Sequence, residues 1–339
     1  MRELEFTVIL PVCHGGVSLV KALNSLSQVE YPTDSFEVIV AGTLDDEESK
    51  NTVEAESARS TLDIKYIGCS DRKRVRALNG ACLAARGRIL VFADDDCIFR
   101  KKWLEKFSEI FSREDNIGIV GGKDELESKN SAFDLALDIT LNSFFGTGGL
   151  RRGAGPRAGK YYPKLWNMAI LREVALSVSL KTDKGLARVF NESLSVHEDV
   201  DLADRIEQSG RRIIYAPEVR VGHERDTTFR DFVRRNFTMA RVCRKVGVHR
   251  LPHLALTTFA LGGLALAIAS FFVTPLRSVL LTCLGIYAAI LLGVGISGFR
   301  RSGSLRVLAI TTGLLVSLHL ARGLGYLFPW DDPSEKEIL

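Results

Sequence analysis

The chain has 339 residues, with 45 Lys and Arg against 41 Asp and Glu, and a net charge of +4. This length fits two domains, or one large domain with an appendage. The balanced charge and the 46% hydrophobic content exclude a disordered chain, a disulfide scaffold and a protein held to nucleic acid by bulk positive charge. We therefore expect no nucleic-acid partner.

The first part of the chain reads as cytosolic. Its six cysteines are scattered without a CxxC pair, which is typical of reduced thiols and argues against a zinc site. The opening apolar run, Phe6–Val12, has the length of a strand and lacks the features of a signal peptide.

The first 125 residues alternate short apolar strands with amphipathic helices, a pattern that predicts a parallel sheet covered on both faces. Ligands of such sheets bind at the carboxyl ends of the strands. The predicted strands are Glu5–Leu10, Phe36–Val40, Asp63–Ile67, Arg88–Phe92 and Gly118–Val120.

Three consecutive carboxylates, Asp94–Asp96, follow the fourth predicted strand. Adjacent anions repel one another unless water or a cation neutralises them. Carboxylate oxygens select Mg²⁺ or Mn²⁺, which usually also hold substrate phosphates. The alternative is an acidic turn that caps the helix starting near Lys101.

The block from 131 to 250 is less regular. Residues 146–160 contain six glycines and four basic residues, and they form either a solvated linker or a lid over an anionic ligand. His197-Glu198-Asp199 precedes an amphipathic helix. These acids either cap that helix or supply a general base for an attacking hydroxyl.

The last third of the chain is membrane-like. Thr227–Val246 has the pattern of an amphipathic helix in the headgroup plane. Leu254–Val273, Val279–Ser297 and Leu305–Phe328 are each long enough to cross a bilayer, with three buried soluble helices as the alternative.

The charges near the predicted spans orient them. Arg300, Arg301 and Arg306 lie between the second and third spans, and the tail at 331–337 carries four acids and one lysine. The positive-inside rule then puts the catalytic domain inside and the C-terminus outside. His319 and Arg322 share one face near the outer end of the third span, where snorkelling of Arg322 to the interface is the favoured explanation.

An ordered set of short motifs resembles the family 2 glycosyltransferases of the GT-A fold, over about 240 residues. The nucleotide-binding half is represented by Pro11, Tyr31-Pro32, Glu37–Val40, Ala77–Gly80, Asp94–Asp96 and Trp103-Leu104. The acceptor half is represented by Trp166–Ala169, Arg172-Glu173, Glu198-Asp199, Gly210, Tyr215–Pro217 and Val221–His223.

The resemblance implies a Rossmann-like α/β domain with a mixed sheet, and roles for particular residues. Asp94 and Asp96 would form the DxD motif that holds the donor diphosphate through Mg²⁺ or Mn²⁺, with Asp95 between them. Asp199 would be the catalytic base, with Glu198 beside it, and His223 is either a metal or phosphate ligand or a histidine without a ligand role. Further donor contacts are expected at Pro11, Asp45, Arg74, Asn79, Asn167 and Arg241.

Two departures from the family pattern bear on the nucleotide. The second strand usually ends in an aspartate pair, whereas here Gly42-Thr43 stand there and Asp45-Asp46 follow. The usual Asn-Glu after the first strand is replaced by His14-Gly15. The donor is therefore left as a UDP- or GDP-sugar.

The predicted organisation is a GT-A domain at 1–226 with halves 1–125 and 126–226, an interfacial helix at 227–250, three transmembrane helices at 251–330 and an acidic tail at 331–339. The implied activity is inverting, metal-dependent transfer of a sugar to a hydroxyl of a lipid-linked acceptor, a polyprenyl diphosphate glycan, at the cytoplasmic face. The alternatives are transfer to a polyprenyl monophosphate as in dolichyl-phosphate-hexose synthases, a processive polysaccharide synthase, and a non-catalytic subunit that binds sugar nucleotide. The oligomeric state is left open.

Overall fold

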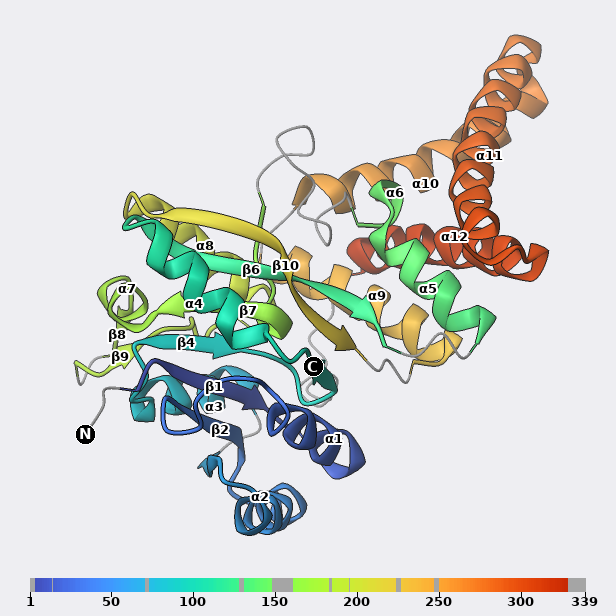
Figure 1. The fold of residues 1–339 in the computed structure, drawn as a ribbon. Helices are drawn as coiled ribbons and strands as arrows, with labels where there is room; N and C mark the ends of the chain where they lie inside the picture. The colour runs from blue at the N-terminus through green and yellow to red at the C-terminus, as the bar shows by residue number, and fades with distance from the viewer. Residues whose placement is uncertain are drawn as a thin grey trace. The chain divides into compact units, whose positions relative to one another are not determined.

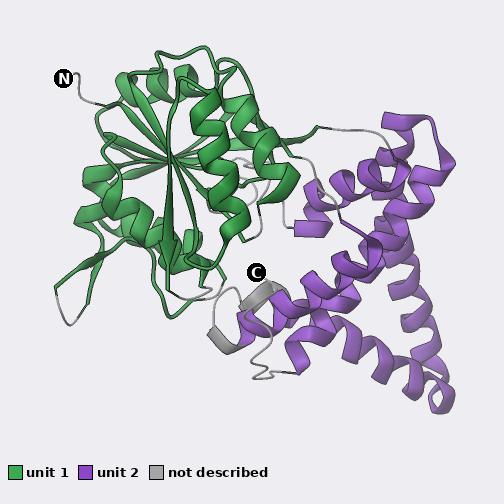
Figure 2. Cartoon of the chain, turned by 90° about the horizontal axis from the view of Figure 1, so that it is seen from below, with its two compact units in different colours: residues 1–127, 152–224, 339 green, residues 128–151, 225–338 purple. Residues whose placement is uncertain are grey.

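The computed structural model describes residues 4–13, 15–70, 73–127, 131–147, 161–182, 185–194, 196–223, 227–246 and 250–328, without the side chains of 245, 246 and 250–252. The chain divides into two compact units (Figure 2). Unit 1 comprises residues 1–127, 152–224 and 339, and unit 2 comprises residues 128–151 and 225–338.

Unit 1 is built on an eight-stranded sheet in the order β3-β2-β1-β4-β7-β6-β10-β5 (Figure 1). β1 to β4 run parallel, β7 is antiparallel to both β4 and β6, β10 is parallel to β6, and β5 is antiparallel to β10. The strands are β1 Phe6–Pro11, β2 Phe36–Thr43, β3 Asp63–Cys69, β4 Ile89–Phe92, β5 Cys97–Phe99, β6 Ile117–Leu126, β7 Met168–Leu171 and β10 Arg212–His223.

The five strands predicted from the sequence are confirmed, and the sheet is mixed, as the resemblance implies. The five predicted strands run in one direction, as their alternation with helices predicts, and the sheet is mixed because β7 and β5 enter in the opposite direction. A small hairpin, β8 Leu180–Lys181 and β9 Ala187–Arg188, forms a separate two-stranded sheet.

Helices cover both faces of the main sheet, because alternate strand residues point to opposite sides and both sides are apolar. Val8 and Leu10 of β1 pack on one face and Ile9 on the other, all fully buried. The first face is covered by α1 Gly16–Leu26, α2 Glu47–Arg59 and α4 Trp103–Arg113. The second face is covered by α3 Arg74–Ala84, α7 Arg172–Ser177 and α8 Glu198–Gln208.

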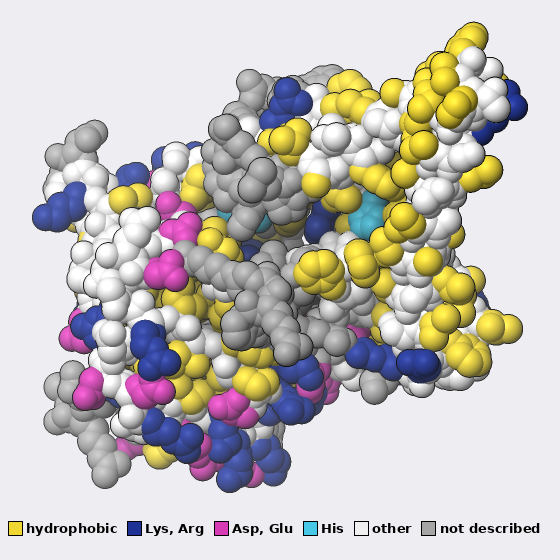
Figure 3. All heavy atoms as spheres, turned by 90° about the horizontal axis from the view of Figure 1, so that it is seen from above, with side chains coloured by type: hydrophobic (Ala, Val, Ile, Leu, Met, Phe, Trp, Pro, Cys, Tyr) yellow, Lys and Arg dark blue, Asp and Glu magenta, His cyan; other side chains and the backbone are white. Residues whose placement is uncertain are grey.

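Unit 2 is helical. Its elements are α5 Ala132–Asn142, α6 Phe144–Thr147, α9 Phe229–Val246, α10 Arg250–Phe272, α11 Thr274–Ser302 and α12 Leu305–Leu327. Three helical segments within the described residues are long and apolar enough to cross a membrane: His253–Phe272, Thr274–Ser302 and Leu305–Leu327. The exposed side chains of α10 and α11 are mainly hydrophobic (Figure 3). The predicted helix at 227–246 is confirmed as α9.

The helix α5 belongs to unit 2, whereas the sequence prediction kept 126–226 in one catalytic domain. Its buried residues Ala136, Leu137 and Ile139 pack with residues of α9, α11 and α12, including Phe232, Val294 and Leu314. The apolar face of α5 therefore finds its partners about 100 to 180 residues further along the chain.

The prediction that Arg322 snorkels to the interface is wrong in this structure. Its guanidinium donates from Nε to Asn236 Oδ1 at 3.0 Å and from NH1 to the carbonyl of Gly146 at 3.0 Å. His319 contacts the carbonyl of Phe145 through Nε2 at 2.7 Å and Tyr287 Oη through Nδ1 at 3.1 Å. Polar groups on an apolar helix are costly without partners, and these side chains find them inside unit 2.

Candidate active site

The acidic triplet lies at the carboxyl end of β4, the edge at which parallel sheets bind ligands. Arg74, the first residue of α3, donates from NH2 to Asp94 Oδ1 at 2.6 Å. Burial, together with the charges of Asp96 and Asp94, raises the pKa of Asp95 to about 7. The three carboxyl groups thus form a strongly anionic turn with one guanidinium already paired to it.

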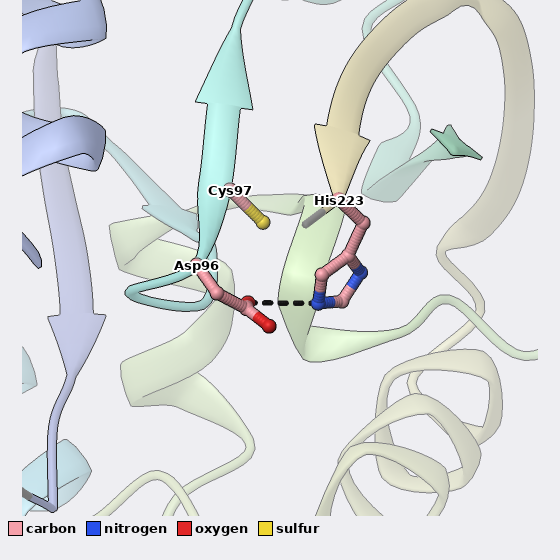
Figure 4. A group of neighbouring side chains, drawn as sticks. All are labelled: Asp96, Cys97 and His223. Carbon is pink, nitrogen blue, oxygen red and sulfur yellow. Dashed lines mark ion pairs between the residues drawn. The ribbon is translucent and has the colours of Figure 1, made fainter. Parts of the chain in front are cut away.

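The antiparallel pairing of β5 and β10 brings His223 to this turn, because His223 lies opposite Cys97 in the register. His223 Nε2 lies 2.7 Å from Asp96 Oδ1, and Cys97 Sγ completes a group whose ligand atoms all lie within 4.8 Å of one another (Figure 4). His223 Nδ1 and Arg74 Nε are buried and have no hydrogen-bond partner among the described residues.

This donor set fits a hard or borderline divalent cation. A carboxylate oxygen and an imidazole nitrogen are ligands for Mn²⁺, Mg²⁺ and similar ions. The thiol of Cys97 is a poorer ligand, since burial raises its pKa and Sγ donates to the carbonyl of Trp166 at 3.6 Å. Asp94 is not part of the group within 4.8 Å, so its role as a metal ligand stays a prediction.

Glu198 and Asp199 open α8, and both are buried. The chain enters this helix through His197, whose φ of 63° lies in the left-handed region. Asp199 accepts hydrogen bonds at both oxygens, from Val200 N to Oδ1 at 2.9 Å and from Lys164 Nζ to Oδ2 at 2.8 Å. The dyad is therefore a held pair of carboxylates and not a solvated cap.

Arg74 links the two acidic groups. Burial raises the pKa of Glu198, the charge of Arg74 opposes this, and Asp199 adds to it. Arg74 thus interacts electrostatically with Glu198 of α8 while it binds Asp94 after β4. Both helices that carry these residues, α3 and α8, cover the same face of the sheet, so Asp94 after β4 and Glu198 at the start of α8 both interact with one guanidinium.

Two predicted donor contacts have structural roles instead. Asn79 donates to Phe190 O and Glu192 Oε1 and accepts from Phe190 N, at 2.8–3.1 Å. Asn167 accepts from Trp103 Nε1 and donates to the carbonyls of Lys123 and Val219, at 3.0–3.1 Å. The two side chains are 4% and 1% exposed, so neither is available to a nucleotide as placed here.

The remaining predicted contacts are dispersed. Pro11 is the last residue of β1, the strand next to β4 in the sheet. Asp45 is exposed, and Asp46 caps α2 by accepting from Ser49 N at 3.1 Å. Arg241 belongs to unit 2, where its Nε donates to the carbonyl of Phe328 at 3.1 Å. The glycine-rich loop lies outside the described residues from 148 to 160.

Sequence reasoning missed Lys164. It stands just before the 3₁₀ turn η2 Leu165–Asn167, in a stretch with no readable period. Its position two residues before Trp166-Asn167 was the available signal, because that motif leads into β7 beside β4.

Comparisons with known proteins agree with this geometry. Residues 4–241 match the family model described as glycosyltransferase like family 2. The glycosyltransferase AglE of Haloferax volcanii is 28% identical over 125 residues, which cover 37% of this chain and only 40% of that relative.

A solved structure shares the fold. The mannosyltransferase PcManGT from Pyrobaculum calidifontis, in complex with GDP-Man and Mn²⁺, superposes with a TM-score of 0.64 at 17% identity, covering 98% of this chain and 89% of that one. S. aureus TarS 1–349 in complex with UDP-GlcNAc has a TM-score of 0.47 at 17% identity, covering 70% of this chain and 66% of that one. Since the family model spans well over half of the sequence and the fold is that of a GT-A enzyme, the chain belongs to glycosyltransferase family 2 and is a glycosyltransferase.

Proposed function

We propose that this glycosyltransferase transfers a sugar with inversion from a UDP- or GDP-sugar to a hydroxyl of a lipid-linked acceptor at the cytoplasmic face of the membrane. The observation that supports it is the convergence of the Asp94–Asp96 turn and the Glu198-Asp199 dyad on Arg74. Sugar transfer needs a site for the departing diphosphate beside a base for the incoming hydroxyl, and this arrangement supplies both.

The leaving-group side would use a divalent cation, Mg²⁺ or Mn²⁺, held by Asp96 and His223 with Asp94 beside them. When bound, such an ion neutralises the charge that grows on the departing diphosphate. Arg74 would bind the same diphosphate oxygens through its buried Nε and its NH groups. The presence of Mn²⁺ and GDP-Man in PcManGT supports this choice of partners.

The acceptor side would use Asp199 as the general base. Its carboxylate takes the proton from the acceptor hydroxyl as that oxygen attacks the anomeric carbon, opposite the leaving diphosphate, which gives inversion. Burial raises the pKa of its neighbour Glu198, whereas Asp199 is held by hydrogen bonds at both carboxylate oxygens.

The acceptor is proposed to be lipid-linked because unit 2 supplies three long apolar helices and the amphipathic helix α9. A polyprenyl diphosphate glycan keeps its chain in the bilayer and presents its sugar hydroxyls at the headgroups. The orientation rests on the arginines at the end of α11, Arg300 and Arg301, which the positive-inside rule places in the cytoplasm.

One contact favours a second acceptor, a polyprenyl monophosphate. One oxygen of Asp199 is already ion-paired with Lys164, at 2.8 Å, and a phosphate nucleophile needs no base. Replacing Asp199 distinguishes the two acceptors.

The test is Asp199→Asn in the full chain, reconstituted with a membrane lipid extract, metal and candidate sugar nucleotides. We expect nucleotide release and lipid-product formation, followed by mass spectrometry, to fall at least about 100-fold, in line with the usual contribution of a general base. Glu207→Gln, which removes an exposed carboxylate from the same helix, is the control and should keep wild-type turnover. Retention of turnover by Asp199→Asn would favour the monophosphate acceptor.

A further inference from the structure

The active-site region contains a cation that no sequence motif marks. The Nζ atom of Lys164 lies 2.8 Å from Asp199 Oδ2, and the two side chains are only 19% and 11% exposed. A surface ion pair contributes little, but a pair shielded from water interacts much more strongly. Lys164 therefore acts on the Asp199 carboxylate directly.

Asp199 has both acidic and basic groups around it. Glu198 lies beside it on α8, and the charge of the buried Asp199 also raises the pKa of Tyr161. Arg74 acts on Glu198 and is already paired with Asp94. Lys164 is the cation whose ammonium group bonds Asp199 itself.

We propose that Lys164 is a positioning residue for the general base: it fixes the orientation of the Asp199 carboxylate in which that group accepts the acceptor's proton. The hydrogen bond to Oδ2 and that from Val200 N to Oδ1 hold the carboxylate plane from both ends. Each oxygen retains a second lone pair for the acceptor hydroxyl. This inference rests on the proposed function, in which Asp199 is the base.

The test is the kcat and the donor KM of Lys164→Met and Lys164→Arg. Without the ammonium group the Asp199 carboxylate loses one of the two hydrogen bonds that orient it, so Lys164→Met should lose about tenfold or more in kcat with little change in the donor KM. Lys164→Arg keeps a cation that can bond Oδ2 and should recover part of that rate.

The control is Lys106→Met, which breaks an ion pair with Glu109 on α4 and should leave both constants unchanged. A wild-type kcat in Lys164→Met, an equal loss of kcat in Lys164→Arg, or an effect on the donor KM alone would overturn the role of Lys164. Failure of the proposed function looks different, because Asp199→Asn would then remain active whatever Lys164 does.

Unit 2 carries a second, independent inference, about the direction of its helices. α10 and α11 form a hairpin around Val273, with the rings of Phe259 and Tyr287 5.1 Å apart. α11 and α12 are also antiparallel, since Tyr287 bonds His319 near their middle and a Cβ at Gly295 would lie 2.7 Å from Thr312 Oγ1. If all three helices crossed the bilayer, α12 would run parallel to α10, and their C-terminal ends would lie together.

The contacts show the reverse. Thr257, near the start of α10, donates to the carbonyl of Gly323 near the end of α12 at 2.9 Å. The ring of Tyr326 stacks on His253 at 5.7 Å. The end of α12 thus lies at the level where α10 begins.

Both ends of α12 also contact α5 and α9, the helices that follow segments of the catalytic unit in the sequence. Thr140 of α5 contacts the carbonyl of Thr311 at 3.5 Å, and Arg244 of α9 donates to the carbonyls of Tyr326 and Leu327 at 2.7 and 3.0 Å. In the part of the chain that the structure describes, no segment apolar enough to span a membrane separates α5 or α9 from the catalytic unit in the sequence. Of the three long apolar helices, α12 is the most buried and the least hydrophobic. In its most apolar stretch 39% of the residues are buried, and its mean hydropathy is 1.6.

We infer that α12 lies along the catalytic side of the membrane and that only the α10–α11 hairpin enters the bilayer, so that the end of α12 emerges on the same side as the catalytic unit. This replaces the expectation of a C-terminus outside. That expectation counted apolar helices, and counting cannot detect a helix that is covered by other helices.

The test uses the full chain with an epitope tag at the N-terminus or at the C-terminus, in sealed inside-out and right-side-out vesicles. Protease should remove both tags in the same vesicle preparation. Removal of the two tags in opposite preparations would mean three crossings and overturn the inference. This comparison is independent of catalysis and of which face is cytoplasmic.

Discussion

At the scale of single residues, two unpartnered polar atoms lie at the site. Burying a polar atom without a hydrogen bond costs about 1–3 kcal/mol, so each such atom in a folded protein calls for an explanation, of which a bound water or ion is one. His223 Nδ1 and Arg74 Nε are atoms of this kind among the described residues, and both belong to the metal and diphosphate side of the proposed site. Their placement agrees with a site whose ligands complete its hydrogen bonding.

His223→Gln tests the imidazole. Removing a metal ligand should raise the Mn²⁺ concentration for half-maximal activity by at least about tenfold, since even indirect partners of metal ligands are worth that much. The measurement is a Mn²⁺ titration of nucleotide release. Cys97→Ser is the matched control, because the thiol donates to Trp166 O and should not bind the ion. An equal rise in both variants would make Cys97 a ligand.

The sequence predicted the acids of this site better than its amides. An acidic triplet after an apolar strand has few structural explanations, so Asp94–Asp96 were found. Asn79 and Asn167 sit in family-like motifs, but an amide can serve the backbone as readily as a ligand, and here it does. Lys164 could not be found, because its importance depends on a contact 35 residues away.

At the scale of elements, local periodicity predicted what is local. Four of the five strands of the first 125 residues and the helix α9 were predicted to within a few residues, since their apolar patterns are strong, whereas β6 continues to Leu126, beyond the predicted Val120. The antiparallel strands β5 and β7, of three and four residues, were not predicted, because they pair with strands far away in the sequence. The grouping of α5 with unit 2 depends on distant partners that no local pattern reveals.

Leu137→Ala tests the packing of α5. Leu137 is 2% exposed in the cluster shared with α12, and such a truncation in a core costs about 2–5 kcal/mol. Denaturant unfolding in detergent should show a lower midpoint for unit 2. Leu186→Ala is the control, because that side chain is 59% exposed in unit 1. Equal midpoints for both variants would mean that α5 adds no stability to unit 2.

At the scale of the whole molecule, the chain passes between its units three times. It leaves unit 1 after residue 127, supplies α5 and α6 to unit 2, returns at 152 and leaves again after 224 (Figure 2). Neither unit is therefore a continuous stretch of sequence, and the predicted boundary at 226 separates α5 from the helices that cover it. The catalytic fold and the apolar helices are consequently joined by more than one connecting segment of the chain.

This threading imposes an order on biogenesis. A ribosome that has just made Leu137 must add about 180 more residues before Leu314 exists, which takes about 10 to 40 seconds at ~5–20 residues per second. Throughout that interval the apolar face of α5 lacks its full set of partners in unit 2, and lipid is a surface that can cover it. The nascent enzyme would thus be drawn to the bilayer by an internal segment before its long hydrophobic tail has been translated.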